Sequence, residues 1–155
     1  MSFQESAREF LSQQRIAVVG VSRSGSATGN AIFKALRDQG HTVIPMHPDA
    51  TTIEDVPCYP NLQAIPDGVD GVVIVTRPDV TEKIVQDAVA AGVPRVWMHG
   101  NALFGIQNSS VSQRAVAYGR EHGLDVIDGG CPLMFVDFGH KCMRWILGAT
   151  GKLPQ

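Results

Sequence analysis

The sequence predicts an α/β fold with an open, mainly parallel sheet of about five strands covered by helices on both faces. Short, almost wholly apolar segments of strand length alternate with amphipathic segments of helical periodicity. Glycines and prolines separate them at short intervals, and no linker or repeat divides the 155 residues. Strands that are apolar on both sides are typical of parallel sheets with two covered faces. A single domain over residues 1–155 is therefore expected.

The first half of the chain predicts two helices and three strands. Apolar residues at helical spacing, such as Phe3, Ala7 and Phe10, predict an N-terminal helix. The run Arg15–Gly20 ends in glycine, as a buried strand before a tight turn does. The next helix ends before Gly40, where a helix terminator belongs. The expected order is helix 3–13, strand 15–20, helix 30–39, strand 42–45 and strand 70–76.

The second half repeats this alternation. Its first helix has an apolar stripe that includes Val80, Ile84 and Ala88. A later helix ends at Gly123, and a last one is expected to cover most of the C-terminal tail. The expected order is helix 79–91, strand 94–98, helix 112–122, strand 124–127 and a C-terminal helix 135–148, so that the core of the domain spans residues 15–133. In such a sheet a ligand binds beyond the C-terminal ends of the strands, where the strand order reverses.

Composition and charge exclude several classes of partner. Thirteen basic and fifteen acidic residues give a net charge of −2, which argues against nucleic acid or a membrane surface as an electrostatic partner. No run approaches the roughly 20 apolar residues of a membrane span, and the first residues lack the pattern of a signal peptide. Three cysteines without a C-x-x-C pair do not suggest a disulfide framework. We expect a cytoplasmic protein.

The loop after the first strand is the strongest candidate for a binding site. Between Gly20 and Gly29 it holds three glycines, three serines, Thr28 and Arg23. Glycine lets the backbone approach a ligand closely, and the start of the next helix offers free N–H groups and a partial positive charge. The Arg23 guanidinium suits phosphate oxygens. The loop therefore predicts a cradle for a phosphate or a diphosphate.

Neither of the common nucleotide motifs fits this loop. The dinucleotide fingerprint G-x-G-x-x-G has Ser22 where its second glycine belongs, and no carboxylate stands at the end of the second strand, where Met46, His47 and Pro48 follow. The lysine of a G-x-x-x-x-G-K-[S/T] phosphate loop is also missing. A phosphorylated adenosine other than NAD or ATP stays open.

An ordered series of short segments resembles a known family. The segments are Val18–Ser22, Val43–Pro48, Val56–Leu62, Asp70–Pro78, Val96–Gly100 and Gly130–Pro132. The chain is similar to the small stand-alone CoA-binding proteins related to the N-terminal domain of the succinyl-CoA ligase alpha subunit. The resemblance covers about residues 8 to 135. It implies a Rossmann-like three-layer fold that binds coenzyme A or an acyl-CoA at the C-terminal edge of its sheet.

The resemblance also assigns residues to parts of the ligand. The first loop would meet the phosphates, residues 47–48 would bracket the adenosine, residues 76–78 would face the nucleotide from the other side, and residues 98–99 would lie towards the pantetheine. Relatives commonly carry glutamine where this chain has His99. The expected binding residues are Gly20, Val21, Ser22, Arg23, Ser24, Gly25, Thr28, Gly29, His47, Pro48, Thr76, Arg77, Pro78, Met98 and His99.

A non-catalytic binding protein is the function we expect. The ligase-type enzymes need a phosphorylated histidine in a second domain, for which 155 residues leave no room. Cys131 and Cys142 are expected to be packing residues, and no acidic neighbour in the sequence orients His99 for catalysis. We expect no metal site, because the spacing of Asp128, Asp137 and His140 matches no template.

Three alternatives stay open. The same cradle could serve an NAD(P)-binding oxidoreductase or a redox-sensing module, or an interaction subunit could carry a cradle that binds nothing. The apolar faces of the first and last helices could bury against the sheet or against a second copy in a homo-oligomer.

Overall fold

The computed structural model describes residues 1–100 and 109–136. Its centre is a five-stranded sheet in the order β2-β1-β5-β6-β7, and every neighbouring pair of strands is parallel. The expected fold class is confirmed. The strands are β1 (Arg15–Val19), β2 (Thr42–Met46), β5 (Gly71–Ile74), β6 (Arg95–Met98) and β7 (Asp125–Asp128).

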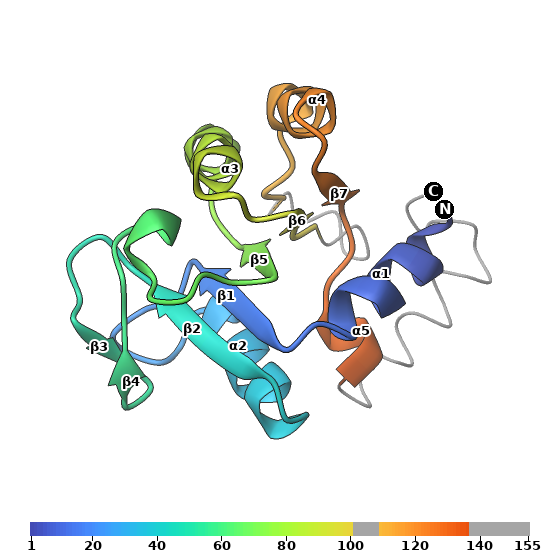
Figure 1. Cartoon of the computed structure of the whole chain (residues 1–155). Helices are drawn as coiled ribbons and strands as arrows, with labels where there is room; N and C mark the ends of the chain where they lie inside the picture. The colour runs from blue at the N-terminus through green and yellow to red at the C-terminus, as the bar shows by residue number, and fades with distance from the viewer. Residues whose placement is uncertain (101–108, 137–155) are drawn as a thin grey trace.

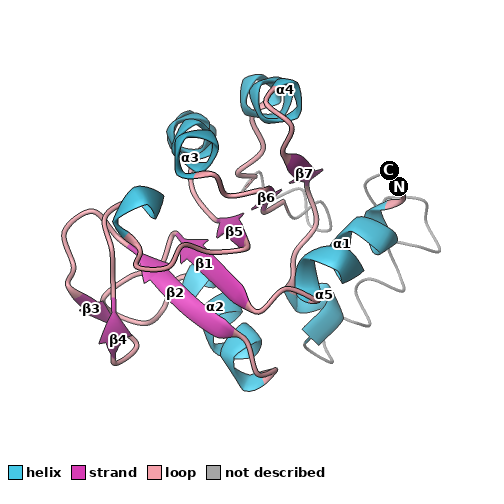
Figure 2. Ribbon diagram, viewed as in Figure 1, coloured by secondary structure: helices cyan, strands magenta, loops and turns pink. Residues whose placement is uncertain are grey.

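Helices cover both faces of this sheet (Figures 1 and 2). On one face lie α3 (Pro78–Ala91) and α4 (Gln113–Glu121), and on the other lie three more helices. These are α1 (Phe3–Leu11), α2 (Thr28–Asp38) and the short α5 (Leu133–Val136). Alternate residues of a strand therefore enter two separate apolar cores, one on each face of the sheet. In β1, Ile16 and Val18 belong to one core, and Ala17 and Val19 belong to the other.

The helices and strands expected between residues 3 and 127 are present, with small shifts at their ends. The second helix begins at Thr28 rather than Asn30, and the last strand runs over Asp125–Asp128 rather than 124–127. The C-terminal helix expected over 135–148 falls mainly outside the described residues, which end at Val136 with α5. Cys142, Asp137 and His140 lie outside them as well.

A small hairpin between β2 and β5 was not expected. It consists of β3 (Thr52–Ile53) and β4 (Val56–Pro57), which pair antiparallel, and it is followed by a short 3₁₀ helix, η1 (Leu62–Ala64). Its turn residues Glu54 and Asp55 have positive φ angles of 52° and 62°. Two-residue strands are too short for a period-of-two pattern to reveal them.

The N-terminal helix packs on the sheet. Phe3, Ala7 and Phe10 of α1 are buried, and the rings of Phe3 and Phe10 meet Trp97 of β6 edge to face at 6.1 and 5.4 Å between centroids. The indole N–H of Trp97 donates to the carbonyl oxygen of Gly129 at 3.0 Å. The apolar face of α1 is therefore buried against the sheet of its own chain, which was one of the two possibilities that the sequence left open.

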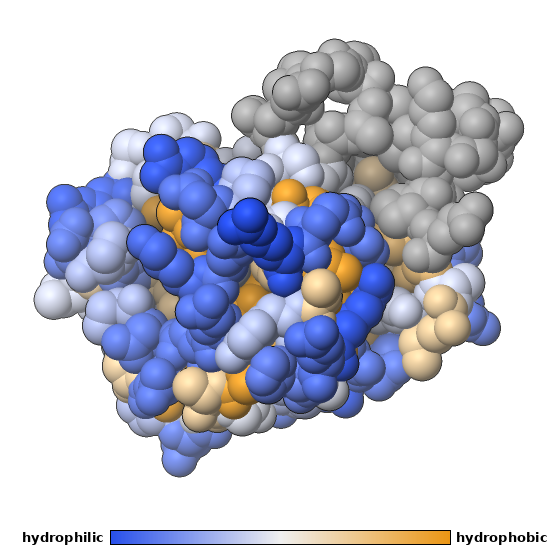
Figure 3. Space-filling view, turned by 90° about the horizontal axis from the view of Figure 1, so that it is seen from above, coloured by the Kyte–Doolittle hydropathy of each residue, from blue (hydrophilic) through white to orange (hydrophobic). Residues whose placement is uncertain are grey.

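The described surface is largely hydrophilic. Seen from above, hydrophobic residues form only small separated patches among hydrophilic ones (Figure 3). Met1 is the one large hydrophobic side chain found exposed in residues 1–100 and 109–136. None of the helices in these two ranges has the length and apolarity needed to cross a bilayer.

Candidate functional site

The order of the strands places the site between β1 and β5. The chain passes from β1 outward to β2, then crosses to β5 on the other side of β1 and continues to β6 and β7. The strand order therefore reverses at the C-terminal ends of β1 and β5, which is where open parallel sheets bind ligands. The residues that leave these two ends are Gly20 and Val75.

Gly20 allows the two strand ends to meet at backbone contact. The Val75 N–H donates to the Val19 carbonyl at 2.9 Å, and Gly20 turns away with a φ of 101°. A Cβ atom on Gly20 would collide with the carbonyl oxygen of Val75. Only glycine fits this φ angle and this close approach to Val75. The packing of β1 against β5 therefore requires glycine at the first position of the loop after β1.

Two helices begin beside this point without a side-chain cap. The N-cap residue of α2 is Ala27 and that of α3 is Arg77, and neither side chain bonds to the first turn. By contrast, Ser2 caps α1 and Ser112 caps α4 through their hydroxyl groups. Uncapped first turns leave N–H groups that need an acceptor, together with the positive end of the helix dipole.

Both uncapped helix starts open into the same cavity of about 410 Å³. This volume lies within the range of about 300–1,000 Å³ that small-molecule sites occupy. No carboxylate and no thiol is among its described lining residues. The lining consists of Gly20, Ala27, Thr28, Val75, Thr76, Arg77, Pro78, His99, Ser109 and Ser110.

Polar residues after β6 form the far wall of this cavity. The Ser110 N–H donates to the His99 carbonyl at 2.8 Å, and its hydroxyl accepts from the Thr76 N–H at 2.9 Å. His99 itself is only 6% exposed, and its N–H donates to the Ile74 carbonyl at 2.9 Å. The segment at Ser110 is thereby tied to the ends of both β5 and β6.

Comparison with known proteins decides the family. The model of a family described as CoA binding domain matches residues 14–137. This range includes the whole sheet, the cavity and the loop after β1. The chain belongs to the CoA-binding domain family.

Its relatives include long enzymes and small proteins. One is an ADP-forming acetate–CoA ligase of Archaeoglobus fulgidus, 29% identical over 75% of this chain but only 17% of the ligase. Another is the uncharacterized protein YneT of Bacillus subtilis, 26% identical over 76% of this chain and 82% of YneT. The solved structure of a hypothetical protein from Pyrococcus horikoshii covers 86% of this chain and 88% of its own at a TM-score of 0.76, with 26% identity. The chain thus spans less than a fifth of the ligase that it matches.

Six of the binding residues predicted for this CoA-binding domain line the cavity. They come from the loop after β1, from the start of α2, from the loop between β5 and α3, and from the end of β6. They are Gly20, Thr28, Thr76, Arg77, Pro78 and His99. Thr28 is 8 residues and His99 is 79 residues after Gly20, yet all of them meet at this cavity. They meet because parallel strands bring their C-terminal ends to the same edge of the sheet.

The rest of the loop after β1 surrounds this point without lining the cavity. The hydroxyl groups of Ser22, Ser24 and Ser26 are linked in a chain, at 2.9 and 2.8 Å. Arg23 is exposed, and Gly25 has a φ of 76°. Their contacts with phosphate stay a prediction.

Five other predicted residues do not line the cavity. Val21 and Met98 are buried in the two apolar cores, 5% and 0% exposed. His47 and Pro48 follow β2, one strand farther along the edge. The Nδ1 atom of His47 accepts from the N–H groups of Asp49 and Ala50, both at 3.1 Å, which fixes the direction of the ring. Gly29 is buried against Gly20.

Sequence reasoning missed several residues of the site. Ala27, Val75, Ser109 and Ser110 line the cavity but carry no distinctive signal. Asn30 is another, because it is wholly buried beside the loop. Asn30 follows Gly29 and lies on the same side of the helix as the apolar Phe33. A polar residue on the apolar side of a helix must find a hydrogen-bond partner when it is buried, and this signal could have identified Asn30.

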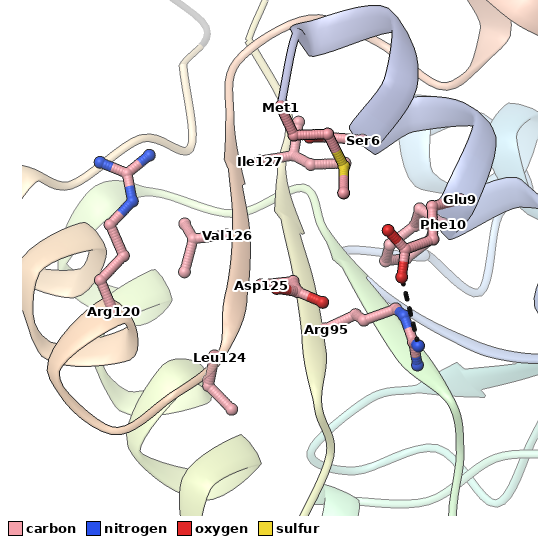
Figure 4. Close-up of a pocket in the computed structure, with 10 residues that line it drawn as sticks. All are labelled: Met1, Ser6, Glu9, Phe10, Arg95, Arg120, Leu124, Asp125, Val126 and Ile127. Carbon is pink, nitrogen blue, oxygen red and sulfur yellow. Dashed lines mark ion pairs between the residues drawn. The ribbon is translucent and has the colours of Figure 1, made fainter.

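A second hollow, of about 220 Å³, lies between α1, β6, β7 and α4 (Figure 4). Arg95 and Asp125, the first residues of their strands, are among its lining, so it reaches the opposite end of the sheet from the cavity. Arg95 pairs with Glu9 at 3.6 Å, while Arg120, at its rim, pairs with Asp128 at 3.6 Å. Charges of both signs offset each other here.

The cysteines in the described residues are buried, which fits the packing role expected for Cys131. Cys58 and Cys131 are both buried, 7% and 3% exposed. Burial raises the pKa of the Cys58 thiol, which makes the thiolate scarce near neutral pH. Residues 1–100 and 109–136 contain no cluster of three or more His, Cys, Asp or Glu side chains that could hold a metal ion.

Proposed function

We propose that this protein binds coenzyme A or an acyl-CoA, with the phosphates held by the loop after β1 and by the starts of α2 and α3. The observation that carries this proposal is the meeting of two uncapped helix N-termini in one cavity at the switch point of the sheet. Coenzyme A carries a diphosphate and a 3′-phosphate, and N–H groups at helix starts are natural hydrogen-bond donors to phosphate oxygens. Membership of the CoA-binding domain family supports the same ligand.

The end of β2 supports CoA over NAD. NAD-binding folds of this kind use a carboxylate at the end of the second strand to accept hydrogen bonds from the ribose. Here β2 ends at Met46, and His47 and Pro48 follow. The first carboxylate, that of Asp49, belongs to an exposed residue three positions beyond the strand end.

The lining of the cavity supports binding without catalysis. Its described residues include no carboxylate and no thiol. Carboxyl groups acting as general acids or bases, and thiolates or carboxylates acting as nucleophiles, must lie within reach of the substrate. We therefore expect an acyl-CoA to be bound and released unchanged.

Calorimetric titration of the full chain with CoA, dephospho-CoA, NAD and NADP tests the ligand. CoA is expected to bind most tightly, with dephospho-CoA weaker because it lacks the 3′-phosphate. A tighter complex with NAD or NADP would favour the oxidoreductase alternative. Absence of binding by all four, together with no shift in Tm at saturating concentrations, would favour an interaction subunit. Incubation of the protein with acetyl-CoA should release no free thiol. Release of thiol that depends on the protein would overturn the proposal that it binds acyl-CoA without catalysis.

A further inference from the structure

Asn30 holds the loop after β1 in place through three hydrogen bonds. Its Oδ1 atom accepts from the Ser22 N–H at 2.7 Å, and its Nδ2 group donates to the Ser22 carbonyl at 3.0 Å. The second hydrogen of the same Nδ2 group is directed to the Glu54 carboxylate at 2.9 Å. The Asn30 residue is 0% exposed, so its side chain depends on these partners to satisfy its polar atoms.

The partner carboxylate comes from a distant part of the chain. Glu54 lies in the turn of the β3–β4 hairpin, with a positive φ of 52°, and is 24 residues from Asn30. Its Oε1 atom also pairs with Lys34 of α2 at 3.6 Å. The same Oε1 atom would be 3.6 Å from a Cβ placed on Gly25, so the carboxylate borders the tip of the loop.

Only an amide side chain satisfies all three partners. It must accept one hydrogen bond and donate two, which a carboxylate cannot do at neutral pH. Serine or threonine has one donor hydrogen and cannot replace both. The pattern therefore specifies asparagine at this position for a reason beyond filling space.

We propose that Asn30 and Glu54 form a clamp that couples the β3–β4 hairpin to the phosphate loop and presets that loop for its ligand. The clamp rests on the proposed function, since it acts through the loop that would hold the phosphates of CoA. Asn30 is a positioning residue here, because its side chain acts through Ser22 rather than on the ligand. The negative charge of Glu54 beside the loop opposes phosphate binding, and Lys34 offsets part of it.

Hydrogen exchange without ligand tests the clamp itself. In Asn30→Ala, the amides of residues 21–26 and of the hairpin around residue 54 should exchange faster than in the wild type, while those of β7 should not change. Glu54→Ala should have the same effect with a smaller amplitude, because the Ser22 bonds remain. Unchanged exchange in both segments would overturn the clamp whatever the protein binds.

Titration with CoA then tests its role in binding. Asn30→Asp keeps the shape of the side chain but replaces the NH₂ group, which donates two hydrogen bonds, by an oxygen that can only accept. We therefore expect CoA to bind roughly tenfold more weakly. Glu54→Ala should weaken it by about threefold to tenfold. Glu54→Gln keeps the acceptor and removes the charge, so we expect binding about twofold to threefold tighter. In the double variant Asn30→Asp with Glu54→Gln, the glutamine can donate to the new carboxylate, and part of the loss should be recovered.

A matched control separates the clamp from general stability. Asp87 accepts from the Leu62 N–H at 2.7 Å and from Gln63 at 2.9 Å, so it is a carboxylate that joins η1 to the C-terminal half of α3, and none of these three residues lines the cavity. Asp87→Ala should lower Tm and leave CoA affinity unchanged. Equal affinity of wild type, Asn30→Asp and Glu54→Ala would overturn the clamp's role in binding. A wild type that binds no CoA but shows the expected exchange pattern would overturn the proposed function and leave the structural clamp standing.

Discussion

Gly29 lies directly against the carbonyl oxygen of Gly20, too close for any side chain between them. The two glycines therefore hold the start of α2 against the end of β1, and the loop between them has both ends fixed. A Cβ atom on Gly29 would meet this oxygen, as well as the Gly20 carbonyl carbon at 2.7 Å. Because these neighbours are backbone atoms, they cannot move aside as a side chain would.

Gly29→Ala is expected to push α2 away from β1. Overpacking of this kind costs about 1–3 kcal/mol of unfolding free energy, and the displaced helix start should weaken CoA binding at least tenfold. Urea denaturation and calorimetric titration measure the two effects. The control is Gly40→Ala beyond the other end of α2, where a Cβ meets nothing within 4 Å and only the positive φ of 95° is unfavourable. It should lose stability but keep its affinity for CoA, and a Gly29→Ala variant that also keeps it would contradict the close-contact argument.

Arg77→Ala should weaken CoA binding by about 1–3 kcal/mol, towards the lower end because the guanidinium is exposed. Arg77 lines the cavity at the start of α3, and its ion pair with Asp79 at 3.3 Å leaves other N–H groups to meet phosphate. The same loss is expected for Arg23→Ala in the loop after β1. The control is Arg37→Ala, which removes an exposed arginine near the far end of α2. If Arg77→Ala and Arg23→Ala bind CoA as tightly as the Arg37→Ala control and the wild type, CoA binding does not depend on the guanidinium groups of Arg77 and Arg23.

The fold could be predicted from the sequence because each layer leaves a local pattern. Strands such as β5 are buried on both faces and read as unbroken apolar runs, while α1 and α3 show one apolar face. The position of the site followed from topology alone, since parallel strands bring their C-terminal ends to one edge. Gly20, predicted from the loop after the first strand, and Thr76 and Arg77, predicted from the family resemblance, all line the cavity at this edge.

What the sequence did not reveal depends on contacts between distant segments. Ser110 is part of the cavity because its hydroxyl reaches Thr76, 34 residues earlier, and no local pattern encodes that distance. Glu54 enters the site through a hairpin of two-residue strands, which leaves no periodic signal. Met98, expected near the ligand, follows the alternation of β6 into the core.

Phe10→Ala should destabilise the protein without changing its affinity for CoA. The Phe10 ring is 2% exposed, packs edge to face on Trp97 at 5.4 Å, and covers Gly71, where a Cβ would lie 2.8 Å from the ring. Loss of a buried phenylalanine costs about 3–5 kcal/mol. Because Phe10 also borders the second hollow, at the opposite end of the sheet, the cavity should keep its shape. Chemical denaturation gives the loss of stability, and a matching loss of CoA affinity in the folded variant would show that α1 contributes to the site.

Cys58 should make the protein less stable in alkaline solution. Burial raises the pKa of its thiol above the ordinary value, so the unfolded chain loses this proton at a lower pH than the folded one. The contribution of the thiol to stability is therefore complete below about pH 8.5 and declines as the pH rises towards the folded-state pKa. Urea denaturation in the presence of a reductant, from pH 7 to 10.5, should show wild type losing stability faster than Cys58→Ala above pH 9. The difference between the two curves removes the titration of all other groups, and parallel curves over this range would mean that the thiol is not shielded from solvent.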